Sequence, residues 1–261
     1  MGGLAITHHR AMPAYYNENN RFAAQWLRNL IAAGEIAPGD VDDRSITEVR
    51  PDDLRGYTEC HFFAGIGGWS AALRLAGWPD DRPVWTGSCP CQPFSASGAK
   101  RGGEDERHLW PAFFDLIREC GPAKVFGEQV AGPDGLAWLD HVFADLEGAG
   151  YAAAAANLPA CGVGADHRRE RVYWVADANG REPWETWEVQ RSGEHRQQPQ
   201  DCGLTPWRGA AVVQCADGRA RRLEPDALPL VDGIPNRLGR LRAYGNAIVP
   251  QVAAVFVMAN V

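Results

Sequence analysis

The chain has 261 residues, of which 45% are hydrophobic and 23% charged, and these ordinary globular values exclude a fibrous or wholly disordered protein. Its length allows one large α/β domain with a small attachment, or two small domains. The formal net charge of −7 argues against simple nucleic-acid binding, but every cation except Lys100 and Lys124 is an arginine, whose planar guanidinium suits phosphate and guanine.

The first predicted elements alternate strand and helix. A short strand over residues 14–16 precedes a helix, which has apolar residues near a 3.6 spacing from Phe22 to Ile31 and ends at Gly34. Residues 40–53 are acidic and loop-rich, with room for one short strand. Residues 60–63 predict another strand, which leads into a glycine turn and a helix over residues 69–76. Such a turn either allows a ligand to approach the backbone or serves tight packing alone.

The middle of the chain carries two candidate catalytic side chains. A strand over residues 83–86 leads to Cys91, which lies between Pro90 and Pro93. Cys91 is a candidate nucleophile or, alternatively, a buried small hydrophobe. A polar loop and a helix over residues 109–120 precede a strand over residues 124–127, which ends at Glu128, a structural cap or a catalytic acid. Without a second cysteine pair at useful spacing we expect no metal.

The last third of the chain is arginine-rich and partly irregular. We expect a helix over residues 135–148, strands over 151–158 and 171–175, and a final apolar helix over 246–260. Residues 167–171 form a charge run, and residues 178–236 show no clear periodicity. The alternation predicts an α/β fold with a mostly parallel, doubly wound sheet.

Five motifs in this order resemble those of the DNA cytosine-5 methyltransferases. They are FAGIGG at 63–68, PCQPFS at 90–95, GEQV at 127–130, RER at 169–171 and YGNAIVP at 244–250. The resemblance covers residues 58–176 and 237–260. It implies a Rossmann-like S-adenosylmethionine-dependent methyltransferase fold and transfer of a methyl group to C5 of a flipped-out cytosine.

The two cofactor elements that this family places between the glycine turn and the Pro-Cys-Gln loop do not fit into residues 69–89. Residues 16–23 resemble the ribose-binding strand end, and residues 39–41 resemble the adenine-contacting turn. Asn20 and Arg21 stand where the family pattern usually has Asp-Pro. The chain is therefore interpreted as permuted, which a parallel sheet tolerates because each strand needs its slot and not a fixed place in the sequence.

The resemblance implies specific roles. Cys91 would add to C6 of cytosine, Glu128 would bind N3 and the exocyclic amine, and Arg169 and Arg171 would face O2 and a nearby phosphate. The expected S-adenosyl-L-methionine-binding residues are Phe63, Ala64, Gly65, Ile66, Gly67, Gly68, Glu18, Asn19, Asp40, Pro90, Leu109, Asn246 and Ala247. The expected DNA-contacting lid residues are Ser95, Ser97, Gly98, Lys100, Arg101 and Arg107. The base that removes the C5 proton is not identified.

We expect residues 1–177 to form the catalytic and cofactor-binding domain, with residues 1–57 as the permuted unit. Residues 178–236 would be a small target-recognition region, and residues 237–261 would return to the catalytic domain. The expected partner is double-stranded DNA, bound in a salt-dependent manner by a monomer. A cognate restriction endonuclease is one further partner open to such an enzyme.

The seven cysteines without a CxxC pair and the absence of a signal peptide predict the cytoplasm, in a bacterial or phage-encoded setting. No apolar run is as long as the ~18 residues of a membrane span. Two alternatives stay open, namely the same fold acting on RNA or transferring another group, and a catalytically weak DNA-binding regulator. The departures at Asn20, Arg21 and Gln129 motivate the second.

Overall fold

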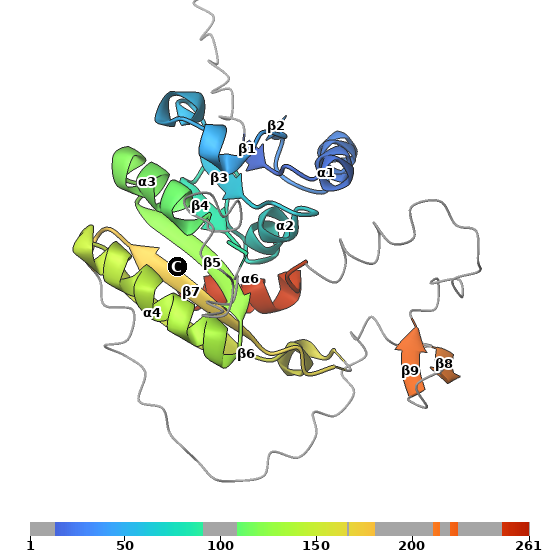
Figure 1. Ribbon diagram of the computed structural model, residues 1–261. Coiled ribbons are helices and arrows are strands. Elements are labelled where there is room, and N and C mark those ends of the chain that lie inside the picture. Colours follow the sequence, from blue (N-terminus) through green and yellow to red (C-terminus); the bar gives the residue numbers. More distant parts are fainter. Residues whose placement is uncertain are drawn as a thin grey trace, which may run out of the picture.

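The computed structural model describes residues 14–90, 109–165, 167–180, 211–214, 220–223 and 247–260 (Figure 1). The strands of its main sheet are β1 (Ala14–Asn17), β2 (Gly39–Asp42), β3 (Glu59–Phe62), β4 (Val84–Gly87), β5 (Lys124–Val130), β6 (Ala152–Leu158) and β7 (Arg171–Asp177). The helices are α1 (Arg21–Ala33), α2 (Gly68–Leu75), α3 (Trp110–Cys120), α4 (Pro133–Gly148) and α6 (Pro250–Met258). Short 3-10 helices are η1 (Ile46–Glu48), η2 (Pro51–Leu54) and η3 (Ala160–Val163).

The sheet has the strand order β2-β1-β3-β4-β5-β7-β6. The first five strands in this order are parallel, whereas β7 runs antiparallel to both of its neighbours. Among the described residues between β6 and β7 there is η3 and no crossover helix, so the chain turns back and the two strands pair antiparallel. The expected mostly parallel, Rossmann-like α/β fold is confirmed.

The strand order shows how the N-terminal unit joins the sheet. β1 lies beside β3, with Tyr16 paired to His61, and β2 forms the edge beyond β1, with Val41 paired to Tyr16. The unit β1-α1-β2 therefore extends the sheet outward from the strand that leads into the glycine turn.

The ends of α1 follow from two residues. The Asn20 side chain accepts hydrogen bonds from the backbone N–H groups of Phe22 and Ala23, which caps the first turn. Gly34 ends the helix in the left-handed conformation, with φ of 75°. Asparagine and aspartate cap helices about equally well, so the departure from the family pattern at Asn20 leaves this helix start intact.

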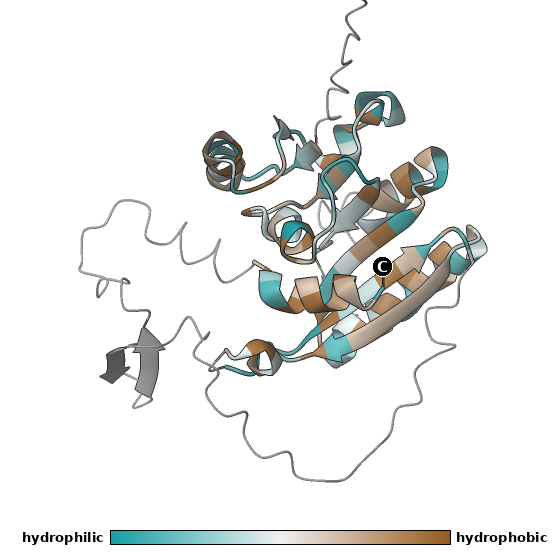
Figure 2. Ribbon diagram, turned by 180° about the vertical axis from the view of Figure 1, so that it is seen from behind, coloured by the Kyte–Doolittle hydropathy of each residue, from teal (hydrophilic) through white to brown (hydrophobic). Residues whose placement is uncertain are grey.

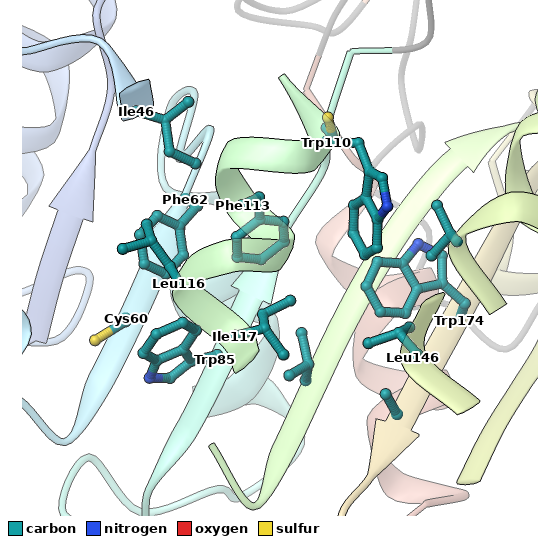
Figure 3. Close-up of a cluster of buried hydrophobic side chains, with 14 of the residues drawn as sticks. Ile46, Cys60, Phe62, Trp85, Trp110, Phe113, Leu116, Ile117, Leu146 and Trp174 are labelled. Atoms are coloured by element: carbon teal, nitrogen blue, oxygen red, sulfur yellow. The ribbon is translucent and has the colours of Figure 1, made fainter. Parts of the chain in front are cut away.

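Buried side chains pack on both faces of the sheet. On one face, α3 and α4 cover a cluster that includes Phe62, Phe113 and Trp174 (Figure 3). On the opposite face, α2 and α6 cover a second cluster that includes Tyr173, the residue that precedes Trp174 on β7. The alternation of side chains along β7 thus supplies both cores, as expected for a strand covered by helices on both sides.

The C-terminal helix α6 closes the second face beside α2. Its colouring is mainly hydrophobic in the view from behind (Figure 2), and Val252, Phe256 and Val257 are buried. Lys124, at the start of β5, donates a 2.6 Å hydrogen bond to the carbonyl of Asn260 just after the helix. The end of the described chain is therefore tied to the middle of the sheet.

Two differences from the sequence-based expectations concern extended segments. β5 continues past the expected end at Gly127 to Val130, because β7 pairs with it from Lys124↔Asp177 to Val130↔Arg171. Within residues 178–236, β8 (Ala211–Gln214) and β9 (Ala220–Leu223) form an antiparallel pair that no periodicity indicated. Among the residues that the structure describes, no helix has the length and apolar character needed to cross a membrane.

Candidate active site

A cavity of about 400 Å³ lies at the carboxyl ends of β1, β3 and β4. This is the edge at which open α/β sheets place their ligands, and the volume lies in the range of small-molecule sites. Its walls are formed by Asn17, Glu18, Asn19, Asn20, Phe22, Ala23, Ile46, Phe63, Gly65, Ile66, Ser88, Pro90, Leu109 and Ala247. The residues come from segments far apart in the chain, so the sheet topology assembles the cavity.

Glu18 joins the N-terminal unit to the glycine turn. One carboxylate oxygen accepts the N–H of Asn20 at 2.8 Å, and the other accepts the N–H of Gly65 at 2.8 Å. Burial raises the pKa of Glu18, although both backbone hydrogen bonds oppose the shift. The two bonds fix the carboxylate in the cavity wall and leave lone pairs on both oxygens for a ligand.

The backbone of the glycine turn adopts positive φ angles, which residues with a Cβ rarely adopt. Phe63 has φ of 51° and Gly65 has φ of 56°. A Cβ on Gly65 would meet only the Phe63 carbonyl oxygen, at 4.0 Å, so the space beside it belongs to the cavity. A Cβ on Gly68 would come within 2.7 Å of Ile248 Cγ1. One glycine therefore opens the turn to a ligand, and the other admits the C-terminal segment.

Most of the described residues expected at a cofactor line this cavity. They are Glu18, Asn19, Phe63, Gly65, Ile66, Pro90, Leu109 and Ala247. Ala64 is buried behind the turn, and Gly67 and Gly68 line an adjoining cavity of about 570 Å³. Asp40 does not line the cavity, because its carboxylate accepts a 2.8 Å hydrogen bond from Tyr57 and faces a separate groove that Asp42 also lines.

Four further residues of the wall, Asn17, Asn20, Phe22 and Ala23, belong to the segment that resembles the ribose-binding strand end, although none of them was assigned to the cofactor individually. Ser88 and Ile46 were not predicted, but Ser88 follows a predicted strand end, a position that could have marked it. Ile46 follows from no local pattern, since it lies in a segment interpreted as an acidic loop.

Glu128 and Arg171 form an ion pair between adjacent strands. Glu128 lies on β5 and Arg171 begins β7, and their Oε1 and Nε atoms are 2.9 Å apart. The side chains are 11% and 21% exposed, respectively. Burial raises the pKa of Glu128, while the charges of Arg171 and Arg169 act in the opposite direction. The carboxyl group is thus prepared to hold a proton at higher pH than an ordinary glutamate.

Arg169 occupies a different environment from Arg171. Its guanidinium donates a 2.7 Å hydrogen bond to the carbonyl of Ala247, in the C-terminal segment that lines the cavity. Its backbone has φ of 29°, a left-handed conformation that is uncommon for a residue with a side chain. The resemblance assigned the two arginines to the base O2 and a nearby phosphate, and this assignment stays a prediction; in the structure Arg171 pairs with Glu128 and Arg169 binds the Ala247 carbonyl.

Gln129 connects β5 to the segment that precedes Cys91. Its Nε2 donates a 3.2 Å hydrogen bond to the carbonyl of Cys89, and its Oε1 accepts the N–H of Val130 at 2.8 Å. Gln129 is only 4% exposed. The residue next to Glu128 therefore fixes the backbone two residues before the candidate nucleophile.

Several expected site residues lie outside the described ranges. They are Cys91, Ser95, Ser97, Gly98, Lys100, Arg101, Arg107 and Asn246. Their roles stay predictions.

Curated relatives of this chain are type II methyltransferases. M.AgeI of Thalassovita gelatinovora is 33% identical over 105 residues, covering 39% of this chain and 24% of that protein. M.HhaI of Haemophilus parahaemolyticus is 28% identical over 173 residues, covering 51% and 52%. M.NaeI of Lentzea aerocolonigenes is 29% identical over 166 residues, covering 62% and 37%. The matched parts thus span between about a quarter and a half of these relatives.

Among solved structures, a mutant DNMT2 from Spodoptera frugiperda superposes with a TM-score of 0.45 at 16% identity, covering 69% of this chain and 45% of that one. Dnmt2 from S. pombe gives a TM-score of 0.41 at 16% identity, with coverages of 69% and 57%. A family model described as C-5 cytosine-specific DNA methylase matches residues 78–213, just over half of the chain. This segment contains Cys91, Glu128 and Arg171, and the chain belongs to the C-5 cytosine-specific DNA methylase family.

Proposed function

We propose that the chain is a DNA (cytosine-5-)-methyltransferase that uses S-adenosyl-L-methionine. The observation that carries the proposal is the joint placement of a buried Glu128, paired with Arg171, and of Gln129, which binds the carbonyl of Cys89. This placement links the candidate acid to the backbone that leads to the candidate nucleophile. It lies inside the segment that matches the family.

The residues fit a reaction in which cytosine is first made nucleophilic at C5. The Cys91 thiolate would add to C6, and the electron pair of the C5–C6 double bond would move into the ring as an enamine. Glu128 would bind N3 and the exocyclic amine, where its proton stabilises the charge that develops on the ring. Arg171 would orient the Glu128 carboxyl and face the base O2. Once C5 carries the methyl group, loss of the C5 proton and elimination of Cys91 would restore the aromatic ring.

The described cavity fits an adenosyl cofactor. Glu18 offers two carboxylate oxygens, whose remaining lone pairs suit the two neighbouring hydroxyls of a ribose. Ile46, Phe63 and Leu109 add apolar walls suited to a purine. The open space beside Gly65 lets the ligand approach the backbone closely. When bound there, S-adenosylmethionine would supply the electrophilic methyl group.

The cofactor set differs in one place from the expectation based on resemblance. Asp40 would approach an adenine amine only if its side chain left Tyr57, which now donates to it. We therefore propose that Ile46, which lies in the cavity wall, replaces Asp40 as the neighbour of the adenine ring.

We further propose that double-stranded DNA is the substrate and that the target base is flipped out of the duplex, because C6 is inaccessible within a stack. Ser95, Ser97, Gly98, Lys100, Arg101 and Arg107 would contact DNA from the loop after Cys91. Residues 178–236 would carry target recognition, within a chain whose catalytic part spans residues 1–177 and is completed by residues 237–261. We propose that the protein acts as a monomer in the cytoplasm, encoded by a bacterium or a phage, and that a cognate restriction endonuclease is a further partner.

The test is methyl transfer by the purified chain. Duplex DNA of varied sequence is incubated with methyl-labelled S-adenosylmethionine, digested to nucleosides and analysed by mass spectrometry. We expect 5-methyl-deoxycytidine, and its loss in Cys91→Ser and Glu128→Gln. The matched controls Cys120→Ser and Glu147→Gln change exposed residues on α3 and α4 and should retain full activity.

Absence of 5-methyl-deoxycytidine with the unaltered chain across all duplexes would refute DNA methylation. A parallel digest of tRNA separates the alternatives, because a methylated nucleoside found only there would identify an RNA methyltransferase. Product formation that persists in Cys91→Ser would refute the covalent route.

A further inference from the structure

Three contacts hold residues 247–249 against the rest of the fold. Arg169 donates to the Ala247 carbonyl at 2.7 Å. Ile248 lies over Gly68 at the start of α2, so closely that a Cβ there would come within 2.7 Å of it. The backbone of Val249 hydrogen-bonds to Tyr173 of β7. Two of these three contacts come from the chain at the start of β7, and one comes from the glycine turn.

Ala247 of this segment belongs to a wall shared by two cavities, whereas Ile248 and Val249 line only the second of them. Ala247 lines both the 400 Å³ cavity and the adjoining 570 Å³ cavity, as does Ile66 of the glycine turn. Arg169 lines only the second of them. Any shift of Ala247 therefore changes the shape of the candidate cofactor cavity, and the Arg169 guanidinium contacts Ala247 from the other side.

The backbone at Arg169 is strained in a way that directs its side chain. A φ of 29° in a residue with a Cβ costs on the order of 1 kcal/mol or more. Arg168, the preceding residue, has an 83% exposed side chain, and Arg171, two residues later, pairs with Glu128. The local reversal thus gives three neighbouring arginines three different environments.

We propose that Arg169 is a positioning residue that fixes residues 247–249, and with them the Ala247 wall of the cofactor cavity, and joins this wall to the strand that carries Arg171. It acts through the Ala247 carbonyl and does not contact the target cytosine. The inference rests on the proposed function, since it assigns the 400 Å³ cavity to S-adenosylmethionine. It predicts that the effect of Arg169 on the cofactor exists before any DNA is bound.

The test compares Arg169→Gly, Arg169→Lys and the control Arg168→Gly in the full chain. Glycine accepts the positive φ without strain, so Arg169→Gly removes the guanidinium while favouring the native backbone. We expect the Kd for S-adenosylmethionine, measured by calorimetry without DNA, to rise about 10-fold, as for loss of one charge-assisted hydrogen bond. Lysine keeps a charged donor and should restore most of the affinity, and Arg168→Gly should leave the Kd unchanged.

Amide hydrogen exchange in the cofactor-free chain is the second measurement. We expect faster exchange at residues 247–249 in Arg169→Gly than in Arg168→Gly, with both variants folded. An unchanged Kd and unchanged exchange, together with a lowered kcat, would assign Arg169 to the base and overturn the inference. Failure of the unaltered chain to bind S-adenosylmethionine would instead overturn the proposed function itself, and the assignment of the cavity with it.

Discussion

Replacement of Gln129 by leucine is the sharpest test of how the candidate nucleophile is placed. The Gln129 side chain is buried and makes one hydrogen bond to the Cys89 carbonyl and one to the N–H of Val130. Leucine has a similar volume and no polar atom, so Gln129→Leu removes both bonds with little change in packing. Because Cys91 follows Cys89 by two residues, the variant releases the backbone that presents the thiol.

The magnitude follows from the two groups that lose a partner. Cys89 is 3% exposed, so its carbonyl loses a donor where water does not easily replace it. Val130 is 41% exposed, so its N–H can be solvated at lower cost. One buried and one solvated loss together give a decrease of about 2 kcal/mol in the free energy of unfolding. In a chain of this size such a decrease lowers Tm by roughly 4–8 °C.

The assay is thermal unfolding combined with single-turnover methyl transfer. Gln25→Leu is the matched control, because Gln25 is exposed on α1 and bonds only across one helical turn, to Asn29 at 3.1 Å. We expect Gln129→Leu to lower both Tm and the rate of the chemical step, and Gln129→Asn to fall between it and the unaltered chain. A Tm loss no larger than that of Gln25→Leu would refute the proposed anchoring of Cys89.

Three further predictions concern the same sheet. Gly127→Ala should destabilise the chain by about 2–3 kcal/mol in denaturant unfolding, because its Cβ would overlap the buried Trp174 ring, and Trp174→Phe should partly relieve this cost. Lys124→Met removes the ion pair with Asp177 and should lower the free energy of unfolding by about 2 kcal/mol at neutral pH. Burial raises the pKa of Asp177, but the N–H of Asn179 and the Lys124 ammonium lower it by more. The cost of the substitution should therefore shrink as pH falls below ~4 and Asp177 becomes protonated. The rate of methyl transfer should fall on the alkaline side at a pH above the usual pKa range of a glutamate, because burial raises the pKa of Glu128. Arg171→Gln should raise this pKa further, because it removes the positive charge that opposes the shift.

Local patterns predicted the elements well where a segment carries its own signal. The helices over residues 109–120 and 135–148 and the strand over residues 151–158 match α3, α4 and β6 within two residues at each end. The predicted end of β5 at Gly127 was wrong, because pairing with β7 extends the strand to Val130, and β7 begins about 40 residues later in the chain. A strand end that depends on a distant partner has no local signal.

The contacts of charged side chains were harder to predict than the elements. Arg169 and Arg171 are two residues apart, a spacing that in a regular strand places both side chains on one face. The positive φ at Arg169 breaks this rule and directs its guanidinium to Ala247. Asp40 likewise matches the expected motif in sequence, but Tyr57, from the segment after η2, binds its carboxylate outside the cavity. Both outcomes depend on tertiary contacts.

The strand order has a structural consequence in the connection from β2 to β3. β3 lies on the side of β1 that faces the centre of the sheet, so the chain must pass from the edge strand β2 across β1 to reach it. This return carries η1 and η2, whose residues Ile46 and Leu54 are buried in the cluster beneath α3. Ile46 also lines the candidate cofactor cavity, and Figure 3 shows it beside the first turn of α3. The connection that this strand order requires therefore supplies part of the candidate site, and no local motif marks Ile46 because it reaches the cavity from a distant segment.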